Sequence, residues 1–318
     1  MNIYDSALQY GLYGLLEGTN RQSNGNTFFV DSTNGSNSAG GTWGESWTTP
    51  YATVNYAVSK CTTGAGDVIL VALGHAETIT ATSTASGSST GQFCIDKGDV
   101  SIIGMGRGSK RPTFTFTTAA AAGVHIVGTS PNILMANLLF VSAYTNGLTS
   151  CVNVPANAYG LTIENCEFRE TLNTQEMLKT ISIAAACEDV SIRGCVFNGV
   201  EGGTCSDAIV CAGAAPRLHV NDCIFNGDWS AACISASVAA SLNVIIADNL
   251  FDNLDPAIGK CVVVHASTTG HFARNLMHAG KDTVSPLTST LLICCENYAT
   301  NFEAESGNLC PAVGDWAT

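Results

Sequence analysis

Carboxylates near the ends of two neighbouring segments are the residues whose chemistry would matter most if the chain were an enzyme. Asp252 and Asp255 come from one segment and Asp228 from the segment before it. Two carboxyl groups about 5–10 Å apart can act as acid and base, or acid and nucleophile, on a glycosidic bond. Acidic residues in loops are also common where they have no catalytic role. We therefore expect no catalytic residue among them.

The other residue types that could do chemistry show no supporting pattern. The six histidines form no HxH or HExxH spacing, and no nucleophile elbow marks a serine. Gly104–Gly108 is rich in glycine, but no helix pattern follows it, which disfavours a phosphate loop. Trp43, Trp47 and Trp229 could stack on sugars, although packing is the alternative that we favour for the first two. We expect no metal ion and no cofactor.

A short cassette returns along the chain with its key residues in register. It reads LTIENCEF at 161–168, VSIRGCVF at 190–197, LHVNDCIF at 218–225 and VIIADNLF at 244–251, with weaker copies at 133–140 and 270–277. Apolar and polar residues alternate within it, which is the period of a strand and not of a helix. Units that return every 26 to 29 residues stack and bury one another's apolar faces. The repeat therefore predicts a solenoid of parallel strands, with one early strand and one cassette strand in each coil.

The cassettes align two columns of residues that we expect to form ladders in the core. The first column is Phe140, Phe168, Phe197, Phe225, Phe251 and Met277. The second lies two residues earlier and holds Cys166, Cys195, Cys223, Asn249 and Asn275. Stacked asparagines satisfy one another's amides, and buried cysteine behaves as a small apolar residue. We interpret most of the 14 cysteines as free core thiols, with disulfide formation as the alternative.

The segment before the cassettes resembles the entry region of a known superfamily. It has an aromatic strand at 28–30, a Gly/Ser loop, Thr49-Pro50 before an apolar helical stripe that ends at Lys60, and Gly66-Asp67 before a Val/Ile strand. The turn Gly74-His75-Ala76-Glu77 follows. Over residues 27–280 the chain is similar to pectate-lyase-like right-handed parallel β-helix proteins, in particular those of bacteriophage virions. The resemblance implies an all-β, right-handed, single-stranded parallel β-helix with an N-terminal capping helix.

Within that superfamily, pectate lyases hold Ca²⁺ with acidic residues and use an arginine as base on one outer sheet face. The residues of this chain that would correspond are Glu164, Glu167, Arg193, Asp222 and Asp248. A Ca²⁺ site requires several oxygen ligands that converge, and only some of these residues share a column, so we expect a solvated face. The Asn-Thr-Asp, Asp-Asp, Gly-His-Gly and Arg-Ile-Lys motifs of polygalacturonases are absent. The resemblance thus implies the fold and leaves the activity open.

Three segments follow from the repeat and its flanks. Residues 1–25 form a short N-terminal arm with an apolar face made of Ile3, Tyr4, Leu8, Leu12, Tyr13, Leu15 and Leu16. Glycines at 11, 14 and 18 weaken an isolated helix, so we expect the arm to become ordered on a partner and to serve attachment, not stability. Residues 26–290 form the β-helix. Residues 291–318, where the cassette is lost, form a C-terminal cap or subunit contact.

The composition restricts the partners. Charged residues make up 12% of the chain and the net charge is −13, without a basic stripe, so we expect no nucleic-acid partner. No apolar run approaches the roughly 20 residues of a membrane span, so we expect no membrane partner. The N-terminus lacks the pattern of a signal peptide, which predicts that the chain is not exported by the Sec route. Low charge on an elongated solenoid predicts burial between subunits, and we expect a homotrimer.

Two classes of function are compatible with these features. We expect a non-enzymatic structural protein of a tailed bacteriophage virion, namely a trimeric decoration or cement protein on the capsid surface. It would be assembled in the host cytoplasm and attached through its arm, with the major capsid protein or another virion component as partner. The alternative is a tailspike-like polysaccharide depolymerase or an adhesin that binds a cell-surface glycan. A groove lined by carboxylates and exposed aromatic residues would favour this alternative.

Overall fold

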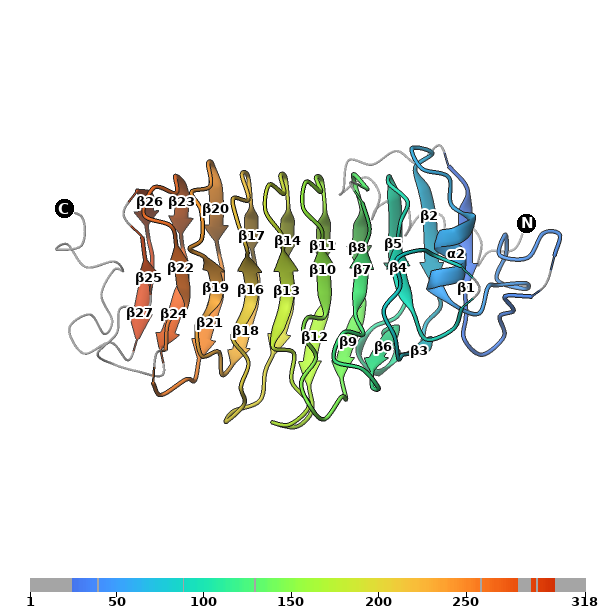
Figure 1. The fold of residues 1–318 in the computed structure, drawn as a ribbon, viewed down its shortest axis with the longest axis horizontal. Helices are drawn as coiled ribbons and strands as arrows, with labels where there is room; N and C mark the ends of the chain where they lie inside the picture. The colour runs from blue at the N-terminus through green and yellow to red at the C-terminus, as the bar shows by residue number, and fades with distance from the viewer. Residues whose placement is uncertain are drawn as a thin grey trace.

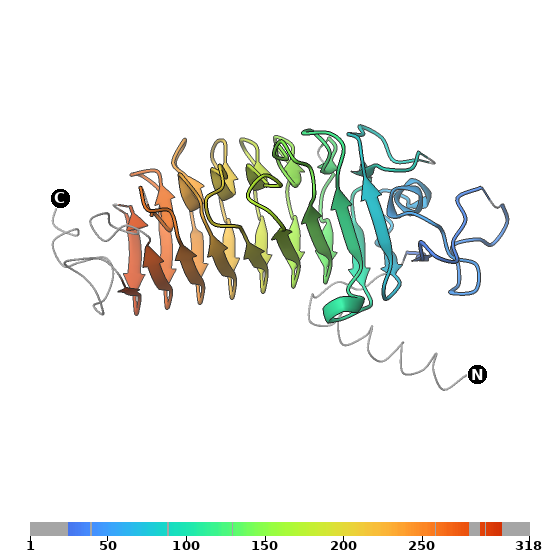
Figure 2. The same ribbon diagram turned by 90° about the horizontal axis from the view of Figure 1, so that it is seen from below.

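The chain folds into one elongated coil of short strands (Figure 1). The computed structural model describes residues 25–279 except for positions 39, 88, 129 and 258, together with residues 287–289 and 291–300. Each full coil of the chain adds one strand to each of three parallel sheets, so neighbouring strands come from successive coils. The coils stack along the long axis of the molecule, as Figure 2 also shows. This arrangement confirms the predicted right-handed parallel β-helix.

The three sheets differ in length. In the described residues the first sheet has ten strands: β1 (Thr27–Val30), β2 (Asp67–Val71), β5 (Val100–Gly104), β8 (Leu134–Ala136), β11 (Thr162–Glu164), β14 (Ser191–Arg193), β17 (His219–Asn221), β20 (Val244–Ala247), β23 (Gly270–Ala273) and β26 (Leu292–Cys295). The second has nine: β3 (Ala76–Ile79), β6 (Thr113–Phe116), β9 (Leu139–Ser142), β12 (Glu167–Glu170), β15 (Val196–Asn198), β18 (Ile224–Gly227), β21 (Leu250–Asn253), β24 (Leu276–Ala279) and β27 (Tyr298–Thr300). The third has eight: β4 (Phe93–Ile95), β7 (Val124–Ile126), β10 (Val152–Val154), β13 (Lys179–Ile183), β16 (Asp207–Cys211), β19 (Ala232–Ala236), β22 (Val262–Val264) and β25 (Leu287–Thr288).

Each cassette contains two strands, where the sequence suggested one. The chain passes from the first sheet to the second at a single residue with left-handed backbone, for example Asn165 at φ 52° and Asp222 at φ 56°. The equivalent residue is Gly194 in one coil and Asp248 in another, at φ 60° and φ 61°. Glycine, asparagine and aspartate adopt this conformation at least cost. The turn rotates the chain, so that the side chains on both sides of it point into the same core.

A short helix closes the N-terminal end of the core, as the sequence predicted. Helix α2 (Val54–Lys60) begins later than Pro50, because Thr53 caps its N-terminus by accepting a hydrogen bond from the Tyr56 amide. The buried Glu77 carboxylate accepts a further bond from the Val54 amide at 2.6 Å. His75 donates from Nε2 to the same carboxylate at 2.8 Å and accepts from the Ser32 amide at Nδ1. This chain of bonds joins the helix to the first coils of the solenoid.

The predicted phenylalanine column forms one continuous ladder inside the β-helix. Phe140, Phe168, Phe197, Phe225, Phe251 and Met277 pair in register across successive strands of the second sheet, and all are at most 1% exposed. The rings of Phe197 and Phe225 lie parallel, with centroids 4.6 Å apart. A second inward stack from the first sheet, Ile163, Ile192, Val220 and Ile246, is also in register. The spacing of the cassettes therefore predicted correctly which core residues stack on one another.

The column of small residues two positions earlier is also buried and is joined by hydrogen bonds. The Asn249 side-chain amide donates to Val220 O at 2.8 Å and to Asn275 Oδ1 at 3.0 Å. Asn275 repeats the pattern toward Ile246 O and Asn297 Oδ1. In the coils before them, cysteine thiols such as Cys223 donate to the carbonyl of the preceding coil. The slot thus demands a donor that is small and can reach the neighbouring backbone.

All the described cysteines are free thiols, and burial makes most of them unreactive. Eleven are buried, Cys294 is half-buried and Cys295 is exposed. Burial raises the pKa of the Cys61 thiol to about 12 and that of Cys94 to about 11. Because the thiolate is the nucleophile, a thiol reagent is expected to modify Cys295 quickly and the buried thiols only after unfolding. Mass mapping of the modified peptides from folded and from denatured protein measures these rates, and Cys295→Ser is the control. Rapid modification of Cys166 or Cys195 in the folded protein would contradict the prediction.

The β-helix continues past its expected end at residue 290. Strands β26 and β27 pair in register with β23 and β24, and Asn297 occupies the cysteine/asparagine slot of an additional coil. The cassette escaped detection there because Ala299 stands where earlier coils have phenylalanine or methionine. The arm residues Ile3, Tyr4, Leu8, Leu12, Tyr13, Leu15 and Leu16, and the tail from residue 301, lie outside the described part of the chain. Within that part, no helix has the length and apolar character to cross a membrane.

A candidate carboxylate site beside Trp229

Acidic side chains gather where the chain passes from the second sheet to the third. Glu170 ends β12 and Glu176 lies in the following loop, while Asp228 comes directly after β18 and Asp255 two residues after β21. All four are buried, at 3–8% exposure. Burial of several carboxylates in one region is unusual and is the kind of arrangement that perturbs acid–base chemistry at functional sites. These residues are therefore the strongest candidates for an active site in the described chain.

A pair of glycines makes room for this cluster. Gly199 and Gly227 face each other on adjacent strands, and a Cβ placed on Gly227 would lie 2.8 Å from Gly199 Cα and 3.0 Å from the Trp229 ring. A side chain at Gly227 would push against Trp229 and the Gly199 backbone, and a Cβ on Gly199 would lie 3.2 Å from Gly227 Cα. The glycines thus allow a tryptophan that is 2% exposed to lie beside the carboxylates.

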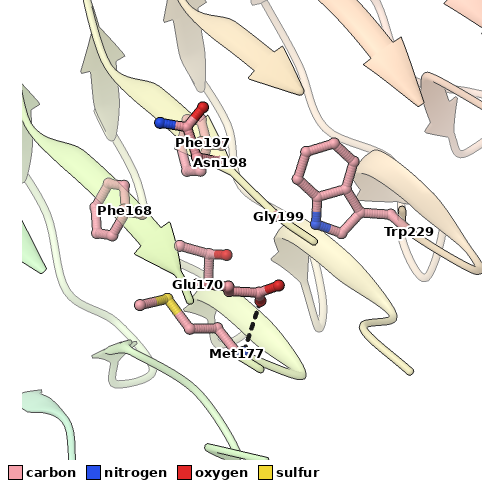
Figure 3. A pocket seen from close by; sticks show the side chains of 8 residues that line it. Phe168, Glu170, Met177, Phe197, Asn198, Gly199 and Trp229 are labelled. Carbon is pink, nitrogen blue, oxygen red and sulfur yellow. Dashed lines mark hydrogen bonds between the residues drawn. The ribbon is translucent and has the colours of Figure 1, made fainter. Parts of the chain in front are cut away.

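The hollow at this place is too small for a sugar. It is lined by Phe168, Glu170, Met177, Thr180, Phe197, Asn198, Gly199 and Trp229 (Figure 3). Its volume is about 170 Å³ including open solvent, with no interior space for a water molecule, whereas ligand pockets usually measure roughly 300–1,000 Å³. Figure 3 shows Glu170 directed at the backbone of Met177, while Trp229 lies apart from it across the hollow. Because it is buried, Trp229 does not offer the sugar-stacking face that the sequence left open.

The Glu170 carboxylate is occupied by donors from two coils. Its Oε1 accepts bonds from the Met177 amide at 2.7 Å and the Cys205 thiol at 3.0 Å, and its Oε2 accepts from the Val200 amide at 3.1 Å. Burial raises the pKa of Glu170 above its ordinary value, although these donors oppose the shift. The side chain thus joins its own loop to the loop of the next coil.

Two other carboxylates of the cluster, Glu176 and Asp228, make the same kind of link. Glu176 accepts bonds from the amide and the hydroxyl of Thr204, one coil away, at 2.7 and 2.6 Å. Asp228 accepts from the Gly202 amide at 2.8 Å, again in a neighbouring coil. Asn253 makes the equivalent link to the backbone of Trp229 with both atoms of its amide. Each side chain therefore fastens one loop to another, as a brace.

Of the three aspartates that the sequence left open as a glycosidase pair, the structure places Asp228 and Asp255 near each other. Burial raises the pKa of Asp228, and the neighbouring Asp255 carboxyl group raises it further. Asp252 points outward from β21 and pairs with His278 at 2.6 Å.

The residues that would correspond to a pectate lyase site do not converge. Glu164 and Arg193 lie on adjacent strands of the first sheet and pair with each other at 3.2 Å. Glu167 belongs to the second sheet and pairs with Arg111 at 3.2 Å. Asp222 and Asp248 occupy the left-handed turns between the sheets. Among the residues that the structure describes, no group of three acidic, histidine or cysteine side chains is placed to hold a metal ion.

Glu170 provides a test of the bracing role. Replacing it by glutamine places an amide donor opposite backbone donors, and the expected loss is about 1–3 kcal/mol of unfolding free energy. The pKa of Glu170 is higher in the folded protein than in the unfolded chain. The contribution of Glu170 to the free energy of unfolding is therefore fully present below the ordinary glutamate pKa, and it decreases as pH rises through the folded-state pKa. The difference in unfolding free energy between the wild type and Glu170→Gln should therefore be largest near pH 4 and smaller at pH 7. Urea unfolding across this range measures it.

The matched control is Glu201→Gln, because Glu201 is exposed in the next loop. It should leave stability nearly unchanged at every pH. A Glu170→Gln variant that is as stable as the wild type, or a gap that widens toward pH 7, would contradict the bracing role.

Comparison with known proteins supports the architecture. No family model and no curated protein sequence matches the chain. A solved structure titled rhamnogalacturonan lyase superposes with a TM-score of 0.53, covering 92% of this chain and 89% of that chain, at 10% sequence identity. At this identity the likeness shows the fold alone, which is the pectate-lyase-like parallel β-helix that the entry region resembled.

Proposed function

We propose that this β-helix is a non-enzymatic structural protein of a tailed bacteriophage virion, a trimeric decoration or cement protein on the capsid surface. The observation that carries the proposal is the use of the buried carboxylates. The first candidates for acid–base chemistry would be Glu170, Glu176 and Asp228. Each of them accepts a hydrogen bond from a backbone amide of a neighbouring coil. Such side chains stiffen a rod, which is what a virion surface component requires. The virion assignment itself is our inference from the resemblance of residues 27–280 to phage β-helix proteins.

An exposed row of apolar side chains supports association of subunits. Val196, Ile224, Leu250, Leu276 and Tyr298 align on the outer face of the second sheet, across five successive coils. The last four are 40–50% exposed. A row of this kind runs parallel to the long axis, so three copies standing side by side in parallel could bury it along one common axis. The low charge of the chain, 12%, agrees with such burial.

The partners in this proposal are further copies of the chain and the major capsid protein or another virion component, met after assembly in the host cytoplasm. The attachment role expected for the N-terminal arm falls on residues outside the described part and stays a prediction.

A carbohydrate-active protein is the second candidate. It is favoured by the structural neighbour, whose title names a lyase that acts on rhamnogalacturonan. A tailspike-like depolymerase or a glycan-binding adhesin would need an open groove, and the half-exposed Asp252–His278 pair on the second sheet is the acid–base pair that such a groove could use.

Two measurements on the purified full chain separate these candidates. Light scattering is expected to give the mass of a trimer, and Leu250→Asp should dissociate it, whereas the outward control Asn226→Asp should not. Incubation with capsular, lipopolysaccharide and polyuronate substrates, with and without Ca²⁺, is expected to release no reducing ends or unsaturated products. A stable monomer would defeat the trimer. Product formation that is lost on Asp252→Asn or Asp222→Asn would establish the carbohydrate-active alternative.

A further inference from the structure

The first sheet carries an apolar patch on its outer face, separate from the core. In strands β2, β5 and β8, alternate residues such as Ile69, Ile102 and Met135 point inward and belong to the main core. The residues between them form a second apolar cluster on the opposite side of the sheet. We call this cluster the outer patch: Val68, Leu70, Ile103, Leu134 and Ala136.

The outer patch is confined to the N-terminal coils. Register places Leu70 beside Ile103, and Ile103 beside Ala136, along one row of outward positions. In the next strand the same row continues with Glu164, which is paired with arginine. Toward the C-terminal end, outward residues such as His271 are exposed. With Phe29 of β1, which lies beside Leu70, the sheet therefore presents an apolar surface over four strands and a polar or open surface beyond them.

The side chains of the outer patch are nearly fully buried although they point away from the core. Each is at most 4% exposed. Phe29, Trp47 and Met105 pack against the cluster and are only partly buried themselves. An outward-facing row of a sheet loses its solvent contact only when another segment lies over it. The outer patch is thus a covered surface, and Phe29, Trp47 and Met105 form the rim of that cover.

We propose that the occupant of the outer patch is the N-terminal arm of the same chain, residues 1–24, bound through the apolar face that contains Leu8, Leu12, Leu15 and Leu16. These residues recur at helical spacing on one side of the segment. Four strands at about 4.8 Å separation extend roughly 15 Å along the axis. An amphipathic helix covering positions 3–16 would be about 20 Å long, which matches the patch together with its aromatic rim.

The point where the arm leaves the described chain makes binding within one copy feasible. The first described residues are held at the edge of the patch, because the Asn26 amide donates to Asp67 Oδ1 at 2.7 Å. Asp67 directly precedes Val68. The polar stretch 18–25 then provides a linker that can span up to about 26 Å when extended. The arm can therefore turn back over β1, β2, β5 and β8 without strain.

This inference is independent of the proposed function, since it concerns only the chain's own surface. It changes the expected role of the arm, because one apolar face cannot contact two surfaces at once. Attachment to another virion component through that face would first require its release from the outer patch. The arm is then a stabilising cover in the free protein.

The first test uses substitutions in the full chain. The double variant Leu8→Asp with Leu12→Asp is expected to uncover the outer patch, lower the melting temperature and raise the fluorescence of a bound hydrophobic dye such as ANS. The matched control, Asn2→Asp with Ser6→Asp, adds the same charge to the polar side and should leave both readings unchanged. If the leucine variant melts like the wild type and binds no more dye than the control, the outer patch has another occupant.

The second test locates the arm directly and distinguishes one copy from two. A photo-crosslinking benzophenone side chain in place of Leu12 is expected to react with peptides that contain Leu70, Ile103 or Leu134. In a mixture of ¹⁴N and ¹⁵N protein, the crosslinked peptides should carry a single isotope. Mixed-isotope products would show that the arm of a second copy binds, and crosslinks to other surfaces would overturn the assignment. Neither result depends on whether the chain cleaves glycans.

Discussion

Replacing Phe197 by alanine is expected to lower the unfolding free energy by about 3–5 kcal/mol, the usual cost of emptying a large buried aromatic site. Phe197 is 1% exposed and stacks on Phe168 at 5.1 Å and on Phe225 at 4.6 Å. The cavity would lie in the middle of the ladder, where rigid rings on both sides cannot collapse into it. Urea unfolding followed by circular dichroism measures the loss, and hydrogen exchange should show it spreading to the neighbouring coils.

Asn198→Ala is the control for this variant. Asn198 is the next residue of β15, but its side chain is half-buried and points away from the core. Asn198→Ala should lower the unfolding free energy by only a small fraction of the decrease expected for Phe197→Ala. Equal losses at the two positions would mean that the ladder is not a main source of stability.

Replacing Asn275 by leucine is the second substitution with a large expected effect, roughly 3 kcal/mol. The leucine has a similar volume but cannot accept the bonds that Asn275 Oδ1 receives from the Asn249 amide and side chain, both at 3.0 Å. It also leaves Ile246 O without its donor at 2.9 Å. Each buried polar group that loses its partner costs about 1–3 kcal/mol.

Asn275→Cys provides the matched comparison, because cysteine fills this slot in earlier coils and its thiol still reaches a backbone carbonyl, as Cys223 does with Ile192 O. The cysteine variant should retain more stability than the leucine variant in thermal unfolding. The opposite order would show that volume matters in this column and hydrogen bonding does not.

The repeat made the core predictable. Residues such as Phe168 and Phe197 were aligned by their distance from one another in the chain, and parallel strands of equal coils convert that distance into direct contact. Register is strongly specified when one face of a strand is buried, because a shift by one residue would turn every apolar side chain outward. The alignment of the cysteine and asparagine column was predictable for the same reason.

The number of strands per coil was underestimated, and the final coil was missed. The left-handed turn at Asn165 interrupts the strand period without any apolar signal, although asparagine, aspartate and glycine in that position are a usable indication. The last coil lacked the aromatic residue on which the alignment relied, since Ala299 occupies its place. A search based on the asparagine slot would have found Asn297.

The role of the acidic residues could not be predicted in the same way. Glu170 bonds to residues 30 and 35 positions away, in a loop whose length differs from that of its neighbours. No period relates such partners, so the sequence left Asp228 and Asp255 open as a catalytic pair. The loop conformations decided that Glu170, Glu176 and Asp228 brace the coils.

By itself, then, the sequence determined what repeats: the strand stacking, the inward ladders, the small-residue column and the capping helix. Those features depend on spacing and on the burial of apolar side chains, both of which can be read along the chain. Only the tertiary structure decided what does not repeat, namely the brace of Glu170 and the outward apolar patch around Leu70. Leu70 lies in a strand that is buried on both faces, where periodicity carries no information about which side a residue takes.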